Sequence, residues 1–396
     1  MDVIWFYVFA VIPFLVGGLL WATGKQVVWQ EWLGGTAIGF AMAGIFHAMA
    51  LFGQTSDVET WSGQLVDGRH IGRWQEYYEE AVYRTETYQS GTDSKGNPEY
   101  STRQVFDHWS SERRWHDDEY HVNSNIDTSH SISKDEYYTI AKTWGGVKAV
   151  PGKRTTGEHA SKMIGGDPND YVMNNKTGYI WPVTKLVSFE NRIKATPTTF
   201  SYSPVPVGTK VFPYPENKNA FMSDRLLGSA TLVNLFAFDQ MNARLGPTKK
   251  VNVILVGFGD RDSMAGQWQE AAWIGGKKND VVICWGGLNS APTWVRAFGW
   301  TEKKTCLRQL ESLILEKGIS EATLPLIEAE IKADYVIKDW KKFDYIRVPA
   351  PTWSIVTYLV VAVIAQSLFW WWANANEFKK IAKEWQSMPR AQRREW

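Results

Sequence analysis

Three long apolar segments constrain this chain of 396 residues more than any other feature: Ile4–Ala22, Trp32–Phe52 and Trp353–Ala373. None of them contains Asp, Glu, Lys or Arg. Each has about the 20 residues that a helix needs to cross the ~30 Å hydrocarbon core of a bilayer. We therefore expect a membrane protein with three transmembrane helices, in which the first two form a hairpin and residues 53–351 form one large extramembrane part.

Basic residues beside these segments predict the orientation, because Lys and Arg concentrate on the cytoplasmic side. The tail 374–396 contains Lys379, Lys380, Lys383, Arg390, Arg393 and Arg394. We expect this tail in the cytoplasm, and the N-terminus and residues 53–351 outside. Met1–Val3 lacks the basic residues of a signal peptide, so the first segment is expected to be retained. A cleaved signal is the alternative.

Small residues recur every four positions in the second segment, at Gly35, Gly39 and Ala43, and His47 lies on the same helix face. Such a stripe lets helix backbones approach closely in lipid. It predicts either a self-association face or a tight hairpin with the first segment. His47 and Gln366 differ in depth by roughly 12 Å, so we expect both to support helix packing rather than ion transport.

The net charge and the two cysteines exclude few classes of function. The net charge of +1 gives no reason to expect nucleic acid as a partner. Cys284 and Cys306 could form a disulfide outside the cytoplasm, but both lie in apolar patterns. Buried free thiols are the favoured interpretation.

Residues 53–220 read as β-structure that ends in a proline-rich extended connector, Thr196–Pro215. The turn composition of Gly91–Pro98 predicts a long hairpin. The expected strands are Val58–Val66, Glu80–Gln89, Glu99–Phe106 and Glu119–Ile126.

Three histidines of this region, His108, His116 and His121, lie near carboxylates in the sequence. Their spacing matches no compact metal site, and on a strand His116 and His121 would point to opposite faces. A solvated polar edge is therefore the favoured interpretation.

Residues 221–351 have the pattern of an α/β domain. Ser223 and Asp224 predict the start of a helix that ends at Gly246-Pro247. The expected elements that follow are strand 250–258, helix 262–273, strands 279–285 and 293–298, and helices 302–317 and 320–343. The continuous apolar runs of the first two strands indicate that helices cover both sheet faces.

Asp260 and Asp262 follow the first of these strands, and Asp280 begins the second. Together they could hold a divalent cation, the only cofactor that the sequence suggests. If the two strands are parallel neighbours, however, the two groups lie at opposite sheet edges. The alternative is a polar corner, with Asp260 or Asp262 capping the next helix.

The strand Val251–Gly257 and the corner Gly275–Val281 resemble the TPM domain in element order and in the Asn279 and Val281 positions. Lys278 and Asp280 depart from that family's pattern. The resemblance implies an α/β sandwich, and for some members metal-dependent phosphatase activity. The corner also resembles that of uncharacterised membrane-anchored proteins of tailed bacteriophages, which implies a bacterial inner membrane with the main domain in the periplasm.

The expected fold class is thus an α+β membrane protein with three transmembrane helices, a β-rich region and a TPM-like α/β sandwich. The expected units are 1–52, 53–220, 221–351, 352–373 and 374–396. No nucleophile elbow, P-loop, dinucleotide fingerprint, HExxH or CxxC motif occurs. We expect a non-enzymatic homo-oligomer that remodels the host envelope or excludes competing phage, with the bilayer and host envelope proteins as partners. A membrane-anchored phosphatase is the alternative.

Overall fold

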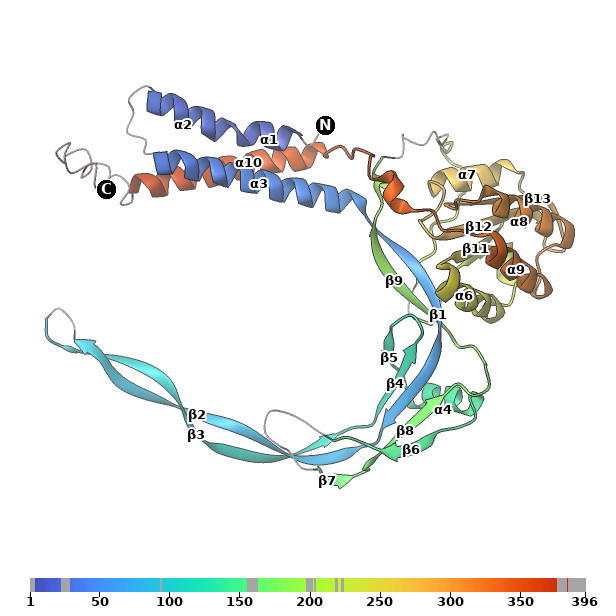
Figure 1. The fold of residues 1–396 in the computed structure, drawn as a ribbon, viewed down its shortest axis with the longest axis horizontal. Coiled ribbons are helices and arrows are strands. Elements are labelled where there is room, and N and C mark those ends of the chain that lie inside the picture. The colour runs from blue at the N-terminus through green and yellow to red at the C-terminus, as the bar shows by residue number, and fades with distance from the viewer. Residues whose placement is uncertain are drawn as a thin grey trace.

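The computed structural model describes residues 4–22, 29–92, 95–154, 163–196, 202, 204–217, 220–221, 224–375 and 383. It is a mixed α+β chain with the shape of an arch (Figure 1). A helix bundle forms one arm, an α/β domain lies near the bend, and a long hairpin returns alongside the helices as the second arm. Met1–Val3 and all basic residues of the tail except Lys383 lie outside the described residues.

Two helices are long and apolar enough to cross a membrane, over Trp32–Thr55 and Thr352–Trp372. They belong to α3 (Trp29–Thr55) and α10 (Thr352–Ala375). The first apolar segment is instead two shorter helices, α1 (Ile4–Ala10) and α2 (Ile12–Ala22). Pro13 has no N–H to donate to the preceding turn, which accounts for the break near Val11.

α3 passes into strand β1 (Ser56–Ile71) without a loop. The carbonyl of Thr55, the last helical residue, accepts a hydrogen bond from the Asn191 amide at 2.6 Å. The Gln54 side chain donates to the Pro349 carbonyl at 2.8 Å, just before α10. The point where the helix becomes a strand is therefore held from two other parts of the chain.

β1 is the central strand of the β-rich region. Its first half pairs with β9 (Pro182–Glu190), and its second half lies between β4 and β8 in the order β5-β4-β1-β8-β6. The other bounds are β4 (Glu119–Ser124), β5 (Ser129–Ser131), α4 (Lys134–Thr143), β6 (Lys148–Pro151), β8 (Asn169–Asn174) and α5 (Arg192–Ala195). Leu65, Val122 and Met173 from the sheet pack with Tyr137 and Trp144 around α4.

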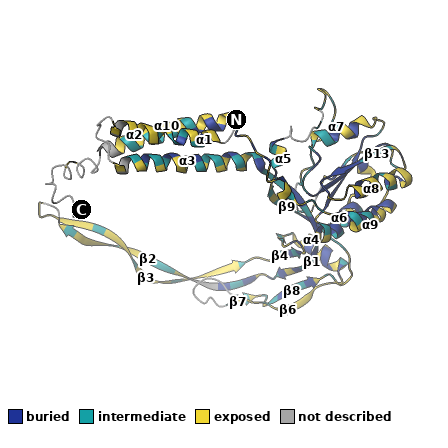
Figure 2. Cartoon of the chain, turned by 45° about the horizontal axis from the view of Figure 1, so that its top comes forward, coloured by how far each residue is buried: buried dark blue, intermediate teal, exposed yellow. Residues whose placement is uncertain are grey.

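The predicted hairpin is confirmed and is longer than expected. β2 (Trp74–Thr92) and β3 (Pro98–His116) pair along their whole length. Only β7 (Met163–Gly166) joins them, at the first residues of β2. Burial decreases along the hairpin from its root, and most of it is exposed (Figure 2).

The α/β domain contains the sheet β10-β11-β12-β13, in which the first three strands are parallel and β13 is antiparallel. The strands are β10 (Leu226–Gly228), β11 (Asn252–Gly257), β12 (Asp280–Leu288) and β13 (Ala291–Gly299). The helices are α6 (Leu235–Lys249), α7 (Met264–Ala272), α8 (Lys304–Lys317) and α9 (Leu324–Asp334), with short 3-10 turns at Ser229–Leu232, Glu321–Thr323 and Trp340–Phe343. The predicted order β-α-β-β-α-α from β11 onward is confirmed.

Apolar clusters on both faces of this sheet explain the continuous apolar strands. α6, α8 and α9 cover one face, and α7 covers the other. Cys306 belongs to the first cluster and Cys284 to the second, and both are buried free thiols, as predicted.

Two predicted helices were wrong. The segment after Asp224 forms β10, and α6 begins only at Leu235, where the Asn234 side chain accepts from the Ala237 amide. α6 then continues through Gly246-Pro247 to Lys249. Glycine is required at 246 for a different reason, since a Cβ there would lie 1.8 Å from the Ser62 carbonyl of β1. Ser223 lies outside the described residues.

The second correction concerns residues 320–343, which were expected to form one helix. α9 begins only at Leu324 and ends at Asp334, and Tyr335 at its C-terminus is extended. Ser320 instead caps the short turn Glu321–Thr323. The apolar pattern continues past α9 because Phe343 and Ile346 pack with Ile193 and Trp300, not because the helix continues.

Candidate functional site

The corner Gly275–Val281 makes polar contacts with both β1 and β11. Ile274, Gly275 and Gly276 all have left-handed backbones, with φ of 52°, 76° and 86°. Two of the three are glycine, which adopts this conformation without strain. The turn directs the Lys277 amide toward the Asp280 carboxylate, at 2.7 Å.

Asp280 is completely buried and its carboxylate is fully engaged. Besides the Lys277 amide, it accepts hydrogen bonds from the Asn252 amide group at 2.9 Å and from the Tyr214 hydroxyl at 2.9 Å. Burial raises the pKa of Asp280, and the hydrogen bond from Asn252 is the largest effect opposing that rise. Burial also raises the pKa of Tyr214 well above its ordinary value.

The buried network continues from Asn252 to Arg225. The Arg225 guanidinium donates to Asn252 Oδ1 at 3.1 Å, to Ser62 Oγ at 2.6 Å and to Asp239 Oδ1 at 2.7 Å. Desolvation lowers the pKa of Arg225, and the nearby carboxylate of Asp239 opposes this. One charged side chain thus connects α6, β11 and β1, with an opposite charge beside it as buried ions require.

Three successive corner residues hold three successive parts of β1. Lys277 Nζ donates to the Val58 carbonyl at 2.6 Å, and Lys278 Nζ lies 3.5 Å from the Glu59 carboxylate. Asn279 Nδ2 donates to the Thr60 carbonyl at 2.8 Å. We call this set of contacts the β1 clamp. It fixes the α/β domain on the strand that continues from α3.

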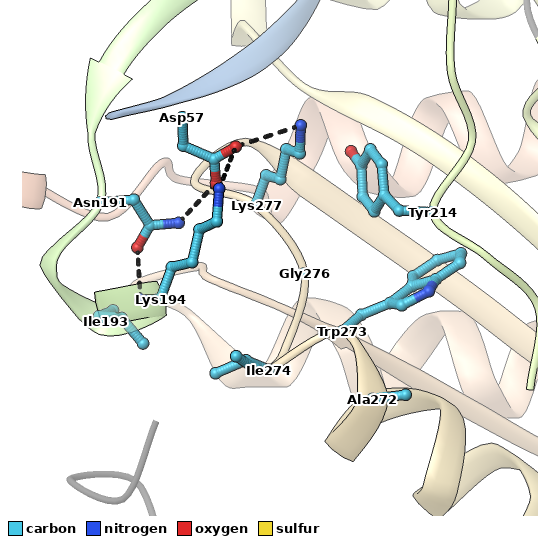
Figure 3. Close-up of a pocket in the computed structure, with 10 residues that line it drawn as sticks. All are labelled: Asp57, Asn191, Ile193, Lys194, Tyr214, Ala272, Trp273, Ile274, Gly276 and Lys277. Carbon is cyan, nitrogen blue, oxygen red and sulfur yellow. Dashed lines mark hydrogen bonds and ion pairs between the residues drawn. The ribbon is translucent and has the colours of Figure 1, made fainter. Parts of the chain in front are cut away.

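A cavity of about 310 Å³ opens beside the clamp (Figure 3). Asp57 accepts from Asn191 Nδ2 at 2.8 Å and pairs with Lys277 at 3.4 Å and Lys194 at 3.7 Å. Lys277 also lies 4.4 Å from the centre of the Tyr214 ring. The remaining lining residues are Ile193, Ala272, Trp273, Ile274 and Gly276.

This lining contains two ammonium groups and one carboxylate that already contacts both of them. None of the ten residues shown is His, Cys or Ser, the usual general bases and nucleophiles. The charges are directed at one another across the joint between α5, β1 and the corner (Figure 3). The arrangement therefore stabilises a joint between parts of the chain.

The proposed metal ligands are not brought together. β11 and β12 are parallel, and Asp280 is the register partner of Asn252 at the first position of each strand. Asp260 and Asp262 follow the other end of β11. Asp262 Oδ1 accepts from the Met264 amide at 3.0 Å, which is the helix-capping alternative. No group of three or more His, Cys, Asp or Glu side chains within the described ranges could hold a metal ion.

The three histidines contact separate carboxylates. His108 lies 2.9 Å from Asp107, and His121 lies 3.2 Å from Glu119. His116 lies 2.7 Å from Glu76, which is completely buried, so this pair is part of the hairpin root and not a solvated edge.

The small-residue stripe of α3 contacts other apolar helices of the same chain. A Cβ at Gly39 would lie 3.1 Å from the Ala10 carbonyl of α1, and Ala43 is buried. His47 Nδ1 is 3.0 Å from the Tyr7 hydroxyl. On α10, Gln366 donates to the Gly35 carbonyl at 2.7 Å. The structure therefore shows tight packing within one chain, and the polar side chains of His47 and Gln366 both support that packing.

Sequence reasoning missed the role of β1. Asp57, Glu59 and Ser62 carry the contacts to the α/β domain, and Arg225 completes them. A signal was present, since a strand next to an apolar segment carries two carboxylates while a distant corner carries two adjacent lysines. Opposite charges of this kind indicate a contact, although they do not identify which pairs form.

Comparison of the chain with protein-family models, with curated proteins and with solved structures finds no match.

Proposed function

We propose that this protein is a membrane-anchored scaffold that acts by self-association and by contacts of its extramembrane part. The observation that carries the proposal is the direct passage of α3 into β1, with the β1 clamp fixing the α/β domain to the same strand. A flexible tether would suit a mobile catalytic domain, whereas a clamped strand fixes the orientation of the outer part relative to the anchor.

The proposal includes three spans, with α1 and α2 together forming the first. Their combined segment Ile4–Ala22 approaches the length needed to cross a bilayer. The basic tail is then cytoplasmic, and the α/β domain lies outside. The resemblance to phage-encoded membrane proteins supports the inner membrane of a bacterial host as the location, with envelope remodelling or superinfection exclusion as the role.

Mass measurement tests the proposal most directly. The full chain, extracted in a mild detergent, is examined by light scattering coupled to size exclusion, with the detergent mass subtracted. We expect a defined particle of several copies. A single copy at every protein concentration, in two different detergents, would count against self-association.

Topology has a separate test. Lys317→Cys introduces an exposed thiol on α8 of the α/β domain, while the native thiols are buried. A membrane-impermeant maleimide should label this variant in intact spheroplasts. Labelling only after membrane disruption would reverse the orientation.

A further inference from the structure

The β2–β3 hairpin has two long edges that no strand covers in the described chain. β3 pairs only with β2, and β2 has a second partner, β7, only over Trp74–Glu76. Two-stranded hairpins are marginally stable alone in water, and open edges accept further strands. Of the usual edge protections, lysine is absent from both strands and the only proline is Pro98 at the start of β3, whereas Arg and Glu side chains and two β-bulges are present.

The hairpin root is held firmly, so the edges are presented in a fixed direction. Trp74 is buried and stacks on His116 at 4.3 Å, and His116 contacts the buried Glu76. The link from β1 is fixed by Arg73, whose amide donates to Asp118 at 3.0 Å and whose carbonyl accepts from Asp167 at 2.9 Å.

The two faces of the hairpin differ. The register places five exposed aromatic residues on one side, which we call the aromatic face: Tyr83, Tyr100, Phe106, Trp109 and Trp115. The other side carries ion pairs such as Arg84–Glu86 at 2.7 Å and Arg103–Glu86 at 3.3 Å. An exposed aromatic face of this extent marks the hairpin as a contact surface.

The charges near the root differ in sign between the two edges. Just beyond the stretch covered by β7, β2 carries Glu79 and Glu80, without a basic residue. β3 carries Arg113 and Arg114 beside Glu112. Two β2 edges would repel each other, whereas a β3 edge beside a β2 edge brings opposite charges together. The hairpin is thus complementary to a second copy placed in the order β2-β3-β2-β3.

We propose that hairpins of neighbouring copies pair edge to edge, the β3 edge of one beside the β2 edge of the next, forming a continuous antiparallel sheet. This inference rests on the self-association proposed above and names its surface. The contact is heterologous, so repetition gives a ring if the rotation closes and an open filament if it does not.

The aromatic face does not have the residue pattern of a strand surface that faces lipid. A lipid-facing strand needs an apolar residue at every second position over about 9–11 residues. Here Thr85, Thr87, Thr102 and Gln104 interrupt the aromatic residues, and Arg113 lies on the same face. Polar residues of this kind suit contact with other strands.

Charge reversal with rescue tests the pairing. Arg113→Glu and Glu79→Arg change residues whose register partners within the hairpin, Tyr77 and Ser111, are uncharged. Each variant alone should assemble at least tenfold more weakly than the wild type, as judged from the concentration dependence of mass in detergent. An equimolar mixture should recover assembly, because each junction between the two different variants joins opposite charges when the variants alternate. Lys317→Glu on α8 is the matched control and should assemble normally.

A variant with a shortened hairpin provides a second test, for the case that charge reversal has no effect or that the charge variants fold poorly. Residues 84–105 are replaced by Asn-Gly, which joins the register partners Tyr83 and Phe106 and leaves the root intact. We expect a monomer or a smaller particle with unchanged circular dichroism in the helical region.

The outcomes separate the two proposals. A monomeric wild type would contradict self-association itself. An oligomeric wild type whose size survives both charge reversal and shortening would leave self-association intact and overturn hairpin pairing. A polarity-sensitive label on Thr102→Cys that reports hydrocarbon in phosphatidylcholine vesicles would mean that lipid covers the hairpin, which would also overturn it.

Discussion

Asp280 has three hydrogen-bond donors directed at it from three parts of the chain: the corner, β11 and the connector before β10. In Asp280→Ala these donors remain buried without an acceptor. Each unsatisfied donor costs about 1–3 kcal/mol, so we expect the free energy of unfolding to fall by at least about 3 kcal/mol. Urea unfolding of the detergent-solubilised chain measures this.

The exposed Asp260 provides the control for that experiment. Asp260→Ala should change stability by less than about 0.5 kcal/mol, as is usual for surface substitutions. Equal effects of the two substitutions would contradict the burial-based explanation. Loss of divalent-ion binding in both variants would instead favour the metal site that the sequence suggested.

A second prediction at the scale of single residues concerns how stability depends on pH below about pH 4. The hydrogen bond from His70, at 2.9 Å, is the main cause that lowers the pKa of Asp118. A lowered folded-state pKa contributes stability above the unfolded value, about 3.9, and this contribution is lost as pH falls through the folded value. Asp118→Asn should therefore make stability less steeply dependent on pH below about pH 4. An unchanged slope in thermal unfolding across that range would exclude this contribution.

Contacts between residues close in the sequence could be predicted, whereas contacts between distant residues could not. The capping role of Asp262 was one of the stated alternatives, because a cap depends on neighbours a few positions away. The partners of Asp280 could not be predicted, since Tyr214 and Asn252 are distant in sequence and meet it only through the sheet register.

Among the elements, α3 makes the closest contacts in the bundle, and its glycines provide a matched pair of sites. Gly39→Val should separate α3 from α1, because a Cβ there already lies 3.1 Å from the Ala10 carbonyl. Gly44→Val should be tolerated, because nothing lies within 4 Å of its Cβ position. We expect a loss of about 1–3 kcal/mol for the first and little change for the second. Thermal unfolding in detergent compares them, and similar midpoints would contradict the packing shown.

The spacing of apolar and polar residues predicted an element correctly when that element's own residues carry the pattern. The buried strands β11 and β12 and the hairpin β2–β3 were all predicted from their residue patterns. The start of α6 was misplaced because β10 is three residues long and is specified by pairing with β11. The predicted strands of the hairpin were too short. Charged and aromatic residues continue to alternate along the exposed strands, so the sequence pattern does not show where each strand ends.

At the scale of the whole molecule, α3 and β1 act as one continuous element. A flexible Gly-Ser insertion between Thr55 and Ser56 should loosen the outer part from the bundle. Spin labels at Gly53→Cys and Lys317→Cys can report the distance, as the native thiols are buried. We expect a narrow distance distribution without the insertion and a broader one with it. Equal widths would show that the segment leading to α10 holds the outer part alone.

The layout of apolar segments around a large middle part could be predicted, because long runs of apolar residues are visible in the sequence itself. The arch could not, since its shape depends on the β1 clamp and on the direction of the hairpin root. The clamp joins residues 219 positions apart, Lys277 and Val58, and the hairpin root joins residues such as Glu76 and His116, 40 positions apart.

The return of the hairpin alongside the bundle has a consequence for the proposed position in a bilayer. Both views show the hairpin and the helices overlapping along the long axis of the molecule (Figures 1 and 2). If α3 and α10 cross a flat bilayer, the ion pairs of the hairpin lie at the depth of the hydrocarbon, which cannot solvate them. Acyl chains then have to be absent from the hollow side of the arch. Copies facing a common centre would border a water-filled opening whose width is set by the arch and not by the helices.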